Sequence, residues 1–388
     1  MAICTIETLE NDSREKMIID LRADAEFVKE SYPGSVNYPA DELMAHTAQL
    51  PKDRPIYLMC YTGVSAAEMA EDLENLGFRE VYGIEGGFRG YRKLMLQRYM
   101  AAQENPARKA QDVERSIIKK FKKEIWRKFT KAINEYEMIQ DGDKIAVCIS
   151  GGKDSMLLAK LFQELYRHGR HNFEVEYIVM NPGYNKLNED TILENARMLG
   201  VPIHVFKTEI FNIVADEEES PCYLCARMRR GYLYAKAKEL GCNKIALGHH
   251  FDDVIETILM GMLYGSQIQT MMPKLHSTNF PGMELIRPMY LIHEADIIHW
   301  MKYNGLHFIQ CACRFTEAQA SREEHEKDSK RAEVKALIKE LAKINPYVPM
   351  NIFRSVENVN LSTVIQYKKD GVKHHFLETY DEGDASEA

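Results

Sequence analysis

Residues 144–155 read KIAVCISGGKDS, and this stretch decides the fold that we expect. The apolar, β-branched run at 145–149 predicts a short buried strand. SGG at 150–152 ends that strand abruptly, and apolar residues recur at helical spacing over 156–165. The glycines therefore lie in a strand-to-helix turn, where backbone N–H groups and a helix N-terminus stabilise an anion.

The side chains of this turn suit a bound polyphosphate. Two glycines let the backbone approach a phosphate closely, two hydroxyls donate hydrogen bonds and an amine adds positive charge: Gly151, Gly152, Ser150, Ser155 and Lys153. Asp154 is unfavourable in a pure anion site, so it indicates a metal ion between carboxylate and phosphate. The alternative is a tight turn that binds nothing, but the strand directly before the motif favours a ligand.

The motif SGGKDS lacks the longer gap before Gly-Lys-Ser/Thr that defines the Walker pattern. It resembles the PP-loop of the ATP pyrophosphatase superfamily, which binds ATP by its β- and γ-phosphates and releases pyrophosphate. This resemblance implies an enzyme that adenylates a carbonyl or amide oxygen, which a nucleophile then displaces.

The composition is that of an ordinary soluble protein. The chain has 388 residues, enough for two or three domains, and is 45% hydrophobic with a formal net charge of -8. No apolar run is long enough to span a bilayer, and residues 1–12 lack a basic segment followed by an apolar one. We therefore expect a cytoplasmic protein without membrane contact. Its 8 cysteines favour metal binding or catalysis over a disulfide framework.

The first hundred residues alternate short strands and helices, which predicts a small parallel α/β domain. An apolar run at 55–59 ends at Cys60, YTGVS follows at 61–65, and a helical pattern continues to Leu76. A cysteine at such a turn meets converging amides and a helix dipole, which favour the thiolate. A buried core thiol is the alternative.

Several motifs in this part resemble a rhodanese domain: DLR at 20–22, PGSVNYP at 33–39, LMCYTGVSA at 58–66, LGF at 76–78 and EGGF at 85–88. The resemblance implies that Cys60 carries a persulfide sulfur in a cradle formed by 61–65. Ser65 stands where the commoner pattern has arginine. A protein persulfide donor, such as a cysteine desulfurase, is therefore an alternative to thiosulfate.

The chain after this domain begins with a polar linker and a basic helix. We expect a sulfur-carrier domain at 1–100, a linker at 101–111, a second domain at 112–367 and a tail without regular structure at 368–388. One long helix is predicted from 112 to 139, apolar on one face. Its other face carries cations: Arg115, Lys119, Lys120, Lys122, Lys123, Arg127, Lys128 and Lys131. This one-sided charge favours contact with a nucleic-acid backbone over a merely solvated face.

Apolar runs at 175–180, 203–206 and 245–247 predict further strands of the second domain. Their alternation with helices predicts a doubly wound parallel sheet, whose ligands bind at the carboxyl ends of the strands. The fold class is thus α/β throughout: a small parallel domain followed by a doubly wound one.

Residues that follow the predicted strands join residues 150–155 at the same sheet edge. We place Met180 and Gly248 beside the nucleotide. Asp252 and Asp253 suit a Mg²⁺ ion beside a triphosphate, and a helix cap is the alternative.

Two cysteine motifs lie in the second domain. Cys222 and Cys225 form a C-x-x-C pair, and Cys311 and Cys313 form a C-x-C pair further on. The first pair alone suits a redox couple, and four thiolates suit tetrahedral zinc. Three thiolates instead hold a 4Fe-4S cluster with one iron open.

Three ordered stretches resemble the tRNA 2-thiocytidine synthetases, relatives of the iron–sulfur tRNA 2-thiouridine synthetases: 133–155, 221–253 and 349–359. The resemblance implies ATP, Mg²⁺, tRNA and a 4Fe-4S cluster held by Cys222, Cys225 and Cys311, with Cys313 as the alternative third ligand. It also implies a basic catalytic residue at Arg229 and a homodimer.

The motifs together suggest one reaction. We expect the enzyme to adenylate the C2 oxygen of a tRNA pyrimidine, a cytidine by resemblance, with Lys153, Asp154 and Asp252 or Asp253 acting on the phosphates. Sulfur from Cys60 would reach the activated carbon through the cluster. The alternatives are lysidine-type ligation, sulfur transfer to another base or a small molecule, and a non-catalytic sulfur carrier.

Overall fold

The computed structural model describes residues 3–101, 106–169, 171–184, 186–210, 221–309 and 330–380. It contains two compact units, one formed by residues 1–251 and 273–328 and the other by 252–272 and 329–388. Two sheets with parallel strands lie in the first unit, and a two-stranded hairpin lies in the second. Across these described ranges, no helix combines the length and the apolar character that crossing a bilayer requires.

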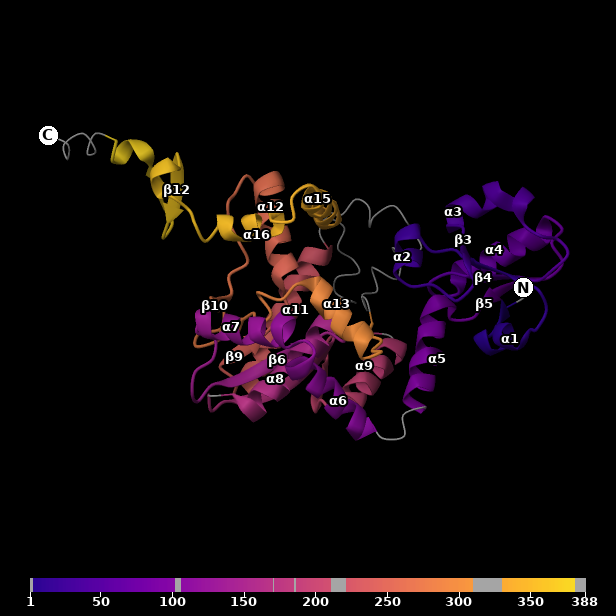
Figure 1. Cartoon of the computed structure of the whole chain (residues 1–388), viewed down its shortest axis with the longest axis horizontal. Coiled ribbons are helices and arrows are strands. Elements are labelled where there is room, and N and C mark those ends of the chain that lie inside the picture. Colours follow the sequence, from indigo (N-terminus) through magenta and orange to yellow (C-terminus); the bar gives the residue numbers. More distant parts are fainter. Residues whose placement is uncertain are drawn as a thin grey trace. The chain divides into compact units, whose positions relative to one another are not determined.

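The N-terminal sheet is built from short strands that alternate with helices (Figure 1, indigo to purple). Its strands are β1 (Ile3–Cys4), β2 (Met17–Asp20), β3 (Val36–Asn37), β4 (Ile56–Met59) and β5 (Val81–Ile84). The helices are α1 (Ile6–Asn11), α2 (Asp24–Lys29), α3 (Ala40–Leu43), α4 (Val64–Asn75) and α5 (Gly87–Ala101), with a 3-10 turn over Met44–Gln49. The order is β1-β5-β4-β2-β3 and all pairs are parallel. Cys60 follows β4 at the carboxyl edge, and the prediction of a small parallel α/β domain is confirmed.

The second sheet has the order β10-β11-β9-β6-β7-β8. Its strands are β6 (Lys144–Ile149), β7 (Glu174–Asn181), β8 (Ile203–Lys207), β9 (Lys244–Ala246), β10 (Lys274–His276) and β11 (Glu284–Ile286). Its pairs are parallel except for β10 with β11 at the edge. The helices between and after them are α8 (Lys153–His168), α9 (Lys186–Met198), α11 (Pro221–Glu239) and α13 (Glu294–Tyr303). The predicted doubly wound sheet is confirmed.

Helices cover both faces of β6, which explains why the strand is apolar throughout. Ala146 and Cys148 point to one face, where they pack with Tyr234 and Ala237 of α11. The alternate residues, including Val147, point to the opposite face, and α8 contacts β6 as well. A strand buried on both sides reads as a continuous apolar run rather than an alternating one.

The connections of β6 create a switch point in the second sheet. The chain continues from β6 to β7 and β8 on one side, and then returns to place β9 on the other side of β6. The loops that follow β6 and β9 therefore diverge to opposite faces. Open α/β sheets bind their ligands in the crevice that this divergence leaves at the carboxyl ends of the strands.

The predicted long helix from 112 to 139 is wrong in its details. The structure has α6 (Pro106–Lys119), a π-helical turn (Lys122–Trp126) and α7 (Arg127–Glu135), so helix also occupies part of the expected linker. The π turn shows in the bond from Trp126 N–H to Phe121 O, 3.2 Å long. Its cause is a spacing of four between buried residues: Ile117, Phe121, Ile125, Phe129 and Ile133. Four residues exceed one α turn of about 3.6, so the wider π turn returns this stripe to one face.

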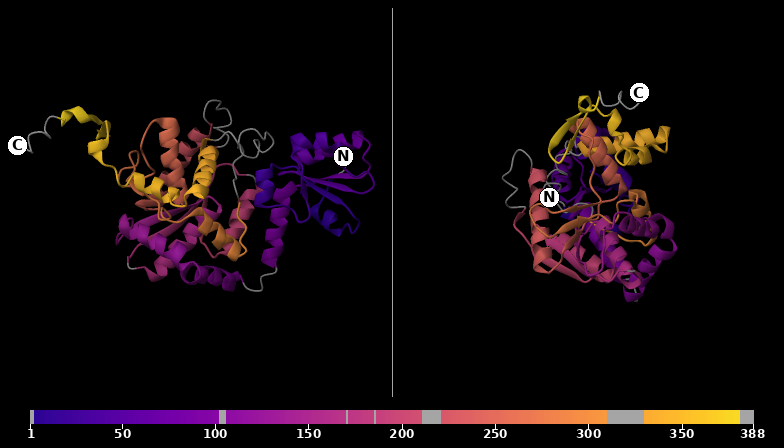
Figure 2. Two further views of the ribbon diagram at one scale, coloured as in Figure 1. Left: turned by 45° about the horizontal axis from the view of Figure 1, so that its top comes forward. Right: turned by 90° about the vertical axis from the view of Figure 1, so that its left-hand side faces the viewer.

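The second unit contains three helices: α12 (Phe251–Gly265), α15 (Lys330–Ile344) and α16 (Val348–Ser355). The first residue of α12, Phe251, still belongs to the first unit. Helices α15 and α16 lie side by side (Figure 2). A 3-10 turn (Leu361–Thr363) follows, and then strands β12 (Gln366–Lys369) and β13 (Val372–His375) form an antiparallel hairpin. A last 3-10 turn spans Phe376–Glu378.

This hairpin corrects the expectation of an irregular tail from Lys368. Asp370 and Gly371 form its turn with φ values of 52° and 84°. Two positive φ values are what a two-residue type I′ turn requires, and Asp-Gly is a typical sequence for it. The acidic residues 381–388 lie outside the described residues.

Candidate functional site

The loop after β6 has a backbone that requires glycine at one position. Gly151 has φ of +87°, and a Cβ added there would lie 2.5 Å from Cγ1 of Ile192. Gly152 then caps α8, whose first residue is Lys153. The first-turn N–H groups of a helix have no partner within the helix, so this loop offers donors to an anion.

Ser155 holds the loop in this shape. Its hydroxyl donates to Gly152 O at 3.0 Å and accepts from the Ser150 N–H at 3.1 Å. The two serine hydroxyl oxygens are 3.2 Å apart. These bonds tie the strand end to the first turn of α8 and so hold the loop in one shape. Donation from Ser150 and Ser155 to a phosphate stays a prediction.

Lys153 lies between two carboxylates. Its Nζ is 3.1 Å from Oδ2 of Asp154 and 3.1 Å from Oε1 of Glu294. Burial alone would lower the pKa of this amine, but the two carboxylates raise it above the ordinary value of 10.5. Lys153, the first residue of α8, is therefore a positively charged hydrogen-bond donor next to the loop.

Glu294 was not among the residues expected from the sequence. It begins α13 and lies 141 positions from Lys153 along the chain. In the sequence it resembles an ordinary acid in a first helical turn, where it interacts favourably with the helix dipole. Its contact with Lys153 arises only because α13 packs beside α8.

Asp154 has the features of a metal ligand. Its Oδ1 is buried and has no hydrogen-bond partner among the described residues. The Nε2 atom of His250 lies 3.8 Å from that oxygen, beyond hydrogen-bond reach. A buried carboxylate oxygen beside a phosphate cradle suits Mg²⁺, which takes oxygen ligands. The residues present therefore fit the expected ion.

Two further expected residues lie at the same sheet edge. A Cβ added to Gly248 would lie 3.3 Å from the backbone N of Ser155, so the loop after β9 closely approaches the start of α8. Met180 is buried near the end of β7, the neighbour of β6. The structure thus brings Met180 and Gly248 to the carboxyl edge that carries the loop, and their contact with a nucleotide stays a prediction.

Asp252 and Asp253 belong to the first turn of α12, in the second unit. Oδ1 of Asp253 accepts a hydrogen bond from Nη2 of Arg331 at 2.8 Å, and Glu256 accepts one from the same guanidinium at 2.8 Å. In the structure described, Asp253 is thus an ion-pair partner. A metal-binding role for this acidic pair stays a prediction.

The cysteine motifs are described only in part. Cys222 and Cys225 lie in the first turns of α11, but their side chains are outside the described residues, and so are Cys311 and Cys313. Leu224, between the first two cysteines, packs against a small cluster formed around Met180. This contact places the start of α11 at the carboxyl edge of β7. Arg229 follows on the same helix and is half-buried.

Cys60 is enclosed by its own loop. The thiol is 6% exposed, and Sγ accepts hydrogen bonds from the backbone N–H groups of Gly63 at 3.0 Å and Ala66 at 3.4 Å. Gly87 has φ of +54°, and a Cβ there would lie 2.2 Å from Cys60 O. This packing holds the loop against the start of α5. Two amides at the sulfur favour a negative charge there.

A buried ion pair between Arg22 and Asp20 lies next to Phe88, which is bonded to the Cys60 loop. The guanidinium of Arg22 donates to Asp20 at 2.9 and 2.7 Å and lies 3.5 Å from the centre of the Phe88 ring. The N–H of Phe88 in turn donates to Cys60 O at 2.8 Å. Asp20 and Arg22 therefore position the loop through Phe88.

The basic face of α6, the π turn and α7 is largely open. Its exposed cations are Arg115, Lys119, Lys120, Lys122, Lys123, Arg127 and Lys131. Lys128 is half-buried and pairs with Asp296 at 3.0 Å. Glu114, by contrast, is buried and binds Lys160 and Arg167 of α8, so it does not neutralise this face. Contact with nucleic acid stays a prediction.

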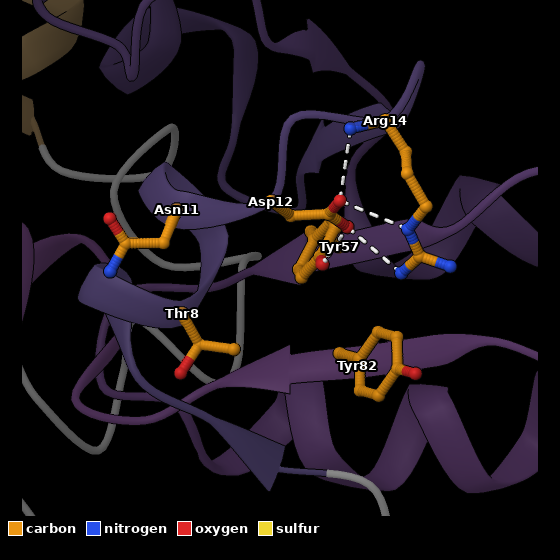
Figure 3. A pocket seen from close by; sticks show the side chains of 6 residues that line it. All are labelled: Thr8, Asn11, Asp12, Arg14, Tyr57 and Tyr82. Atoms are coloured by element: carbon orange, nitrogen blue, oxygen red, sulfur yellow. Dashed lines mark hydrogen bonds and ion pairs between the residues drawn. The ribbon is translucent and has the colours of Figure 1, made fainter.

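A separate cavity of about 480 Å³ lies in the N-terminal domain (Figure 3). Asp12 accepts from Arg14 at 3.0 Å and from the Tyr57 hydroxyl at 2.6 Å within it. Tyr57 stands near the start of β4, whereas Cys60 follows its end. The cavity therefore opens at the opposite edge of the sheet and is not part of the Cys60 site.

Each of the two parallel sheets lies in a region that matches a known protein family. A family model described as a PP-loop domain matches residues 121–314, and one described as a rhodanese-like domain matches residues 5–94. A tRNA-cytidine(32) 2-sulfurtransferase of Geotalea daltonii is 36% identical over 251 residues, which cover 64% of this chain and 94% of that protein. One of Coxiella burnetii is 35% identical over 256 residues, covering 64% and 95%.

A solved structure of a tRNA thiolase is also similar to this chain. The U34-tRNA thiolase NcsA from Methanococcus maripaludis, solved with its 4Fe-4S cluster, matches 60% of this chain and 76% of its own, with 22% identity and a TM-score of 0.47.

Proposed function

Because this chain belongs to the tRNA-cytidine(32) 2-sulfurtransferase family of PP-loop enzymes, we propose that it replaces the C2 oxygen of a tRNA cytidine by sulfur, at the expense of ATP. The chain is an ATP-dependent sulfurtransferase that acts on tRNA. The base, the activation step and the route of the sulfur are the parts proposed here.

One observation carries the proposal: the phosphate loop and the C-x-x-C turn start from the same sheet edge. The loop follows β6, and Leu224 in the first turn of α11 packs against the buried cluster of Met180 and Ile210, with Met180 near the end of β7. Strands β6 and β7 are direct neighbours. Activation and sulfur delivery can therefore meet at one substrate atom.

In the first step the C2 oxygen of the base attacks the α-phosphorus of ATP, and pyrophosphate leaves. The N–H groups at the start of α8 and the amine of Lys153 stabilise the charge that grows on the departing phosphates. Gly151 and Gly248 keep side chains out of the space next to this helix start. The base is thereby converted into an adenylate whose leaving group is AMP.

Two expected cofactors, Mg²⁺ and a 4Fe-4S cluster, would add positive charge at the phosphates and a site for sulfur. Asp154 would hold a Mg²⁺ ion, which would neutralise charge on the phosphates, and we propose Asp252 or Asp253 as a second ligand. Thiolates are the ligands of iron–sulfur clusters, so the donor set Cys222, Cys225 and Cys311 fits a 4Fe-4S cluster, which would supply one iron open to sulfur.

In the second step sulfur replaces the activated oxygen. The outer persulfide sulfur of Cys60 is the source, and a protein persulfide donor such as a cysteine desulfurase reloads it. Reducing that sulfur to the sulfide level takes two electrons, which a thiol reductant supplies, and returns Cys60 as a thiol. Attack on C2 then expels AMP and leaves the 2-thio base. The amides of Gly63 and Ala66 stabilise the persulfide anion on Cys60.

The experiment that tests the proposal is a thiolation assay with the purified, anaerobically reconstituted chain, ATP, tRNA and a thiol reductant. Either a persulfide donor or inorganic sulfide provides the sulfur, and mass spectrometry of the digested tRNA detects 2-thiocytidine. The wild type should make it with both sources, and Cys222→Ala with neither. The reductant is kept at a concentration that releases no appreciable free sulfide from the persulfide donor. Under this condition Cys60→Ser should lose activity with the persulfide and keep it with sulfide.

Cys4→Ser is the matched control in the same domain, because burial raises the pKa of the Cys4 thiol to about 11 and keeps it a poor nucleophile. It should retain both activities. Activity of Cys222→Ala at the wild-type level would contradict a role for the C-x-x-C pair. Equal loss with both sulfur sources in Cys60→Ser would contradict the relay.

A further inference from the structure

The hairpin of the second unit places two lysines directly opposite each other (Figure 1, yellow). Lys368 of β12 pairs across the hairpin with Lys373 of β13. Residues opposite each other in an antiparallel pair point to the same face, with their Cβ atoms about 5 Å apart. Two positive charges in such a position repel each other, so this pair destabilises the hairpin that carries it.

No described acid offsets this repulsion by an ion pair. Both lysine side chains are exposed, and neither amine pairs with a carboxylate among the described residues. The neighbouring cross-strand pair on the same face is Gln366 with His375, which adds no acid. Glu378, which follows β13, binds Nδ1 of His374 at 3.2 Å and accepts from the N–H of His375 at 3.1 Å.

The hairpin also gains little stability from a larger sheet. Strands β12 and β13 form a sheet of two strands, whereas three or more strands are usually needed for independent stability. Its other face carries Tyr367 stacked on His374, with ring centres 5.0 Å apart, and an exposed Val372. Natural sequences keep locally unfavourable arrangements mainly at functional sites, so the lysine pair indicates a binding role.

We propose that Lys368 and Lys373 bind the phosphate backbone of tRNA, which makes the hairpin an RNA-binding element in addition to the basic helices. The inference rests on the proposed action on tRNA. A phosphate between the two amines replaces their repulsion by two attractions, and its binding releases counter-ions from the RNA. A backbone contact positions the substrate but reads no base, so the hairpin adds affinity without selecting the nucleotide.

The same unit offers two matched controls. Lys369 is the next residue of β12 and is equally exposed, but it points to the opposite face and lies across from Val372. Lys369→Gln therefore removes a charge from the hairpin without touching the lysine pair. Lys339→Gln/Lys343→Gln removes two charges from exposed positions of α15.

The first test measures equilibrium binding of tRNA to the full chain at several salt concentrations. Lys368→Gln/Lys373→Gln should raise the Kd at least about fivefold and reduce the slope of log K against log salt by roughly 2, one for each lost phosphate contact. Lys368→Arg/Lys373→Arg should keep the wild-type affinity, because arginine also binds phosphate. Both control variants should change the Kd by less than about threefold.

The second test follows amide hydrogen exchange of residues 366–375. Bound tRNA should slow this exchange in the wild type. Without tRNA, Lys368→Gln/Lys373→Gln should exchange no faster than the wild type, because the substitution removes a repulsion. Faster exchange in this variant would overturn the proposal, since the lysines would then stabilise the hairpin. Wild-type exchange that is unchanged by bound tRNA would overturn it as well.

The assays also separate this inference from the proposed function. A wild-type chain that binds no tRNA would refute the inference together with the proposed action on tRNA. Normal binding by both the wild type and Lys368→Gln/Lys373→Gln would refute the role of the hairpin alone. A change of oligomeric state in this variant at unchanged tRNA affinity, seen by sedimentation, would instead assign the lysine face to a second copy of the chain.

Discussion

At the residue scale, the phosphate cradle depends on the absence of one side chain. Gly151 combines a positive φ with a tight contact, because an added Cβ would meet side-chain atoms of Ile192 at 2.5 Å and Ile309 at 2.8 Å. Gly142 has the same φ of +87° but nothing within 4 Å of an added Cβ. An alanine at Gly142 would therefore introduce backbone strain alone, whereas an alanine at Gly151 would introduce the same strain and a steric clash.

Replacing Gly151 by alanine should distort the cradle as well as strain it. We expect Gly142→Ala to lower the free energy of unfolding by ~1 kcal/mol and to leave nucleotide affinity unchanged. Gly151→Ala should cost more stability and weaken ATP binding at least about tenfold, since the loop must move to admit a methyl group. Thermal denaturation and equilibrium binding of ATP measure the two effects. Equal affinities in the two variants would show that the cradle tolerates the methyl group.

At the element scale, α6 is attached to α8 by a buried ion pair. Nζ of Lys160 is fully buried and lies 2.5 Å from Oε1 of Glu114 and 2.7 Å from Leu199 O. Arg167 binds the second carboxylate oxygen of Glu114. Burial opposes the charge on Glu114, but its two cationic partners lower its pKa below the ordinary 4.5. The helix that carries the basic face is thereby fixed to the helix that begins at the phosphate loop.

Glu114→Gln should therefore destabilise the protein by about 3 kcal/mol, because it leaves the buried Lys160 without its counter-ion. Glu135→Gln on α7 removes an exposed pair with Lys131 and should cost less than about 0.5 kcal/mol. Urea denaturation measures both. A depressed carboxyl pKa stabilises the fold above pH 4.5 and loses that contribution as the pH falls further. The difference between Glu114→Gln and wild type should thus shrink below pH 4.5.

The basic face of α6, the π turn and α7 should contribute electrostatically to tRNA binding. We expect the double variant Lys122→Glu/Lys123→Glu to weaken tRNA binding by more than about tenfold and to reduce the slope of log K against log salt by roughly 2. Lys52→Glu/Arg79→Glu makes the same change in net charge on exposed residues of the N-terminal domain. Titrations at several salt concentrations compare the two. Identical losses would indicate a general charge effect instead of a binding face.

At the scale of the whole molecule, the chain joins a rhodanese-like domain, matched at 5–94, to a PP-loop domain, matched at 121–314. We propose that the first supplies sulfur to the second. A covalent connection raises the effective concentration of the donor to about the millimolar range for a short linker. Sulfur transfer should therefore run mainly within one chain.

Mixing two full-length variants tests this transfer. Lys153→Ala keeps the Cys60 loop, and Cys60→Ser keeps the phosphate loop, so together they supply both functions on different chains. With a persulfide donor and dilute protein, the mixture should reach less than about a tenth of the wild-type thiolation rate. The rate should rise as the protein concentration increases. Full activity at high dilution would contradict transfer within one chain.

Much of this arrangement can be predicted because it is encoded locally. The run KIAVCI followed by SGGKDS determines a buried strand, a glycine turn and a helix start within twelve consecutive residues. The same holds for Cys60 between β4 and α4. The hairpin at 366–375 also had its local signal in Asp370-Gly371, although the acidic residues after it suggested an irregular tail.

The sequence by itself determined the two parallel sheets, the phosphate loop and the position of Cys60, because each depends on neighbours within a few residues. Only the tertiary structure decided the contacts made across the chain. Glu294 meets Lys153 because two helices pack together, and Glu114 faces Lys160 instead of solvent because α6 lies on α8. A spacing pattern identifies which face of a helix is buried, but packing between distant elements determines which charge meets which.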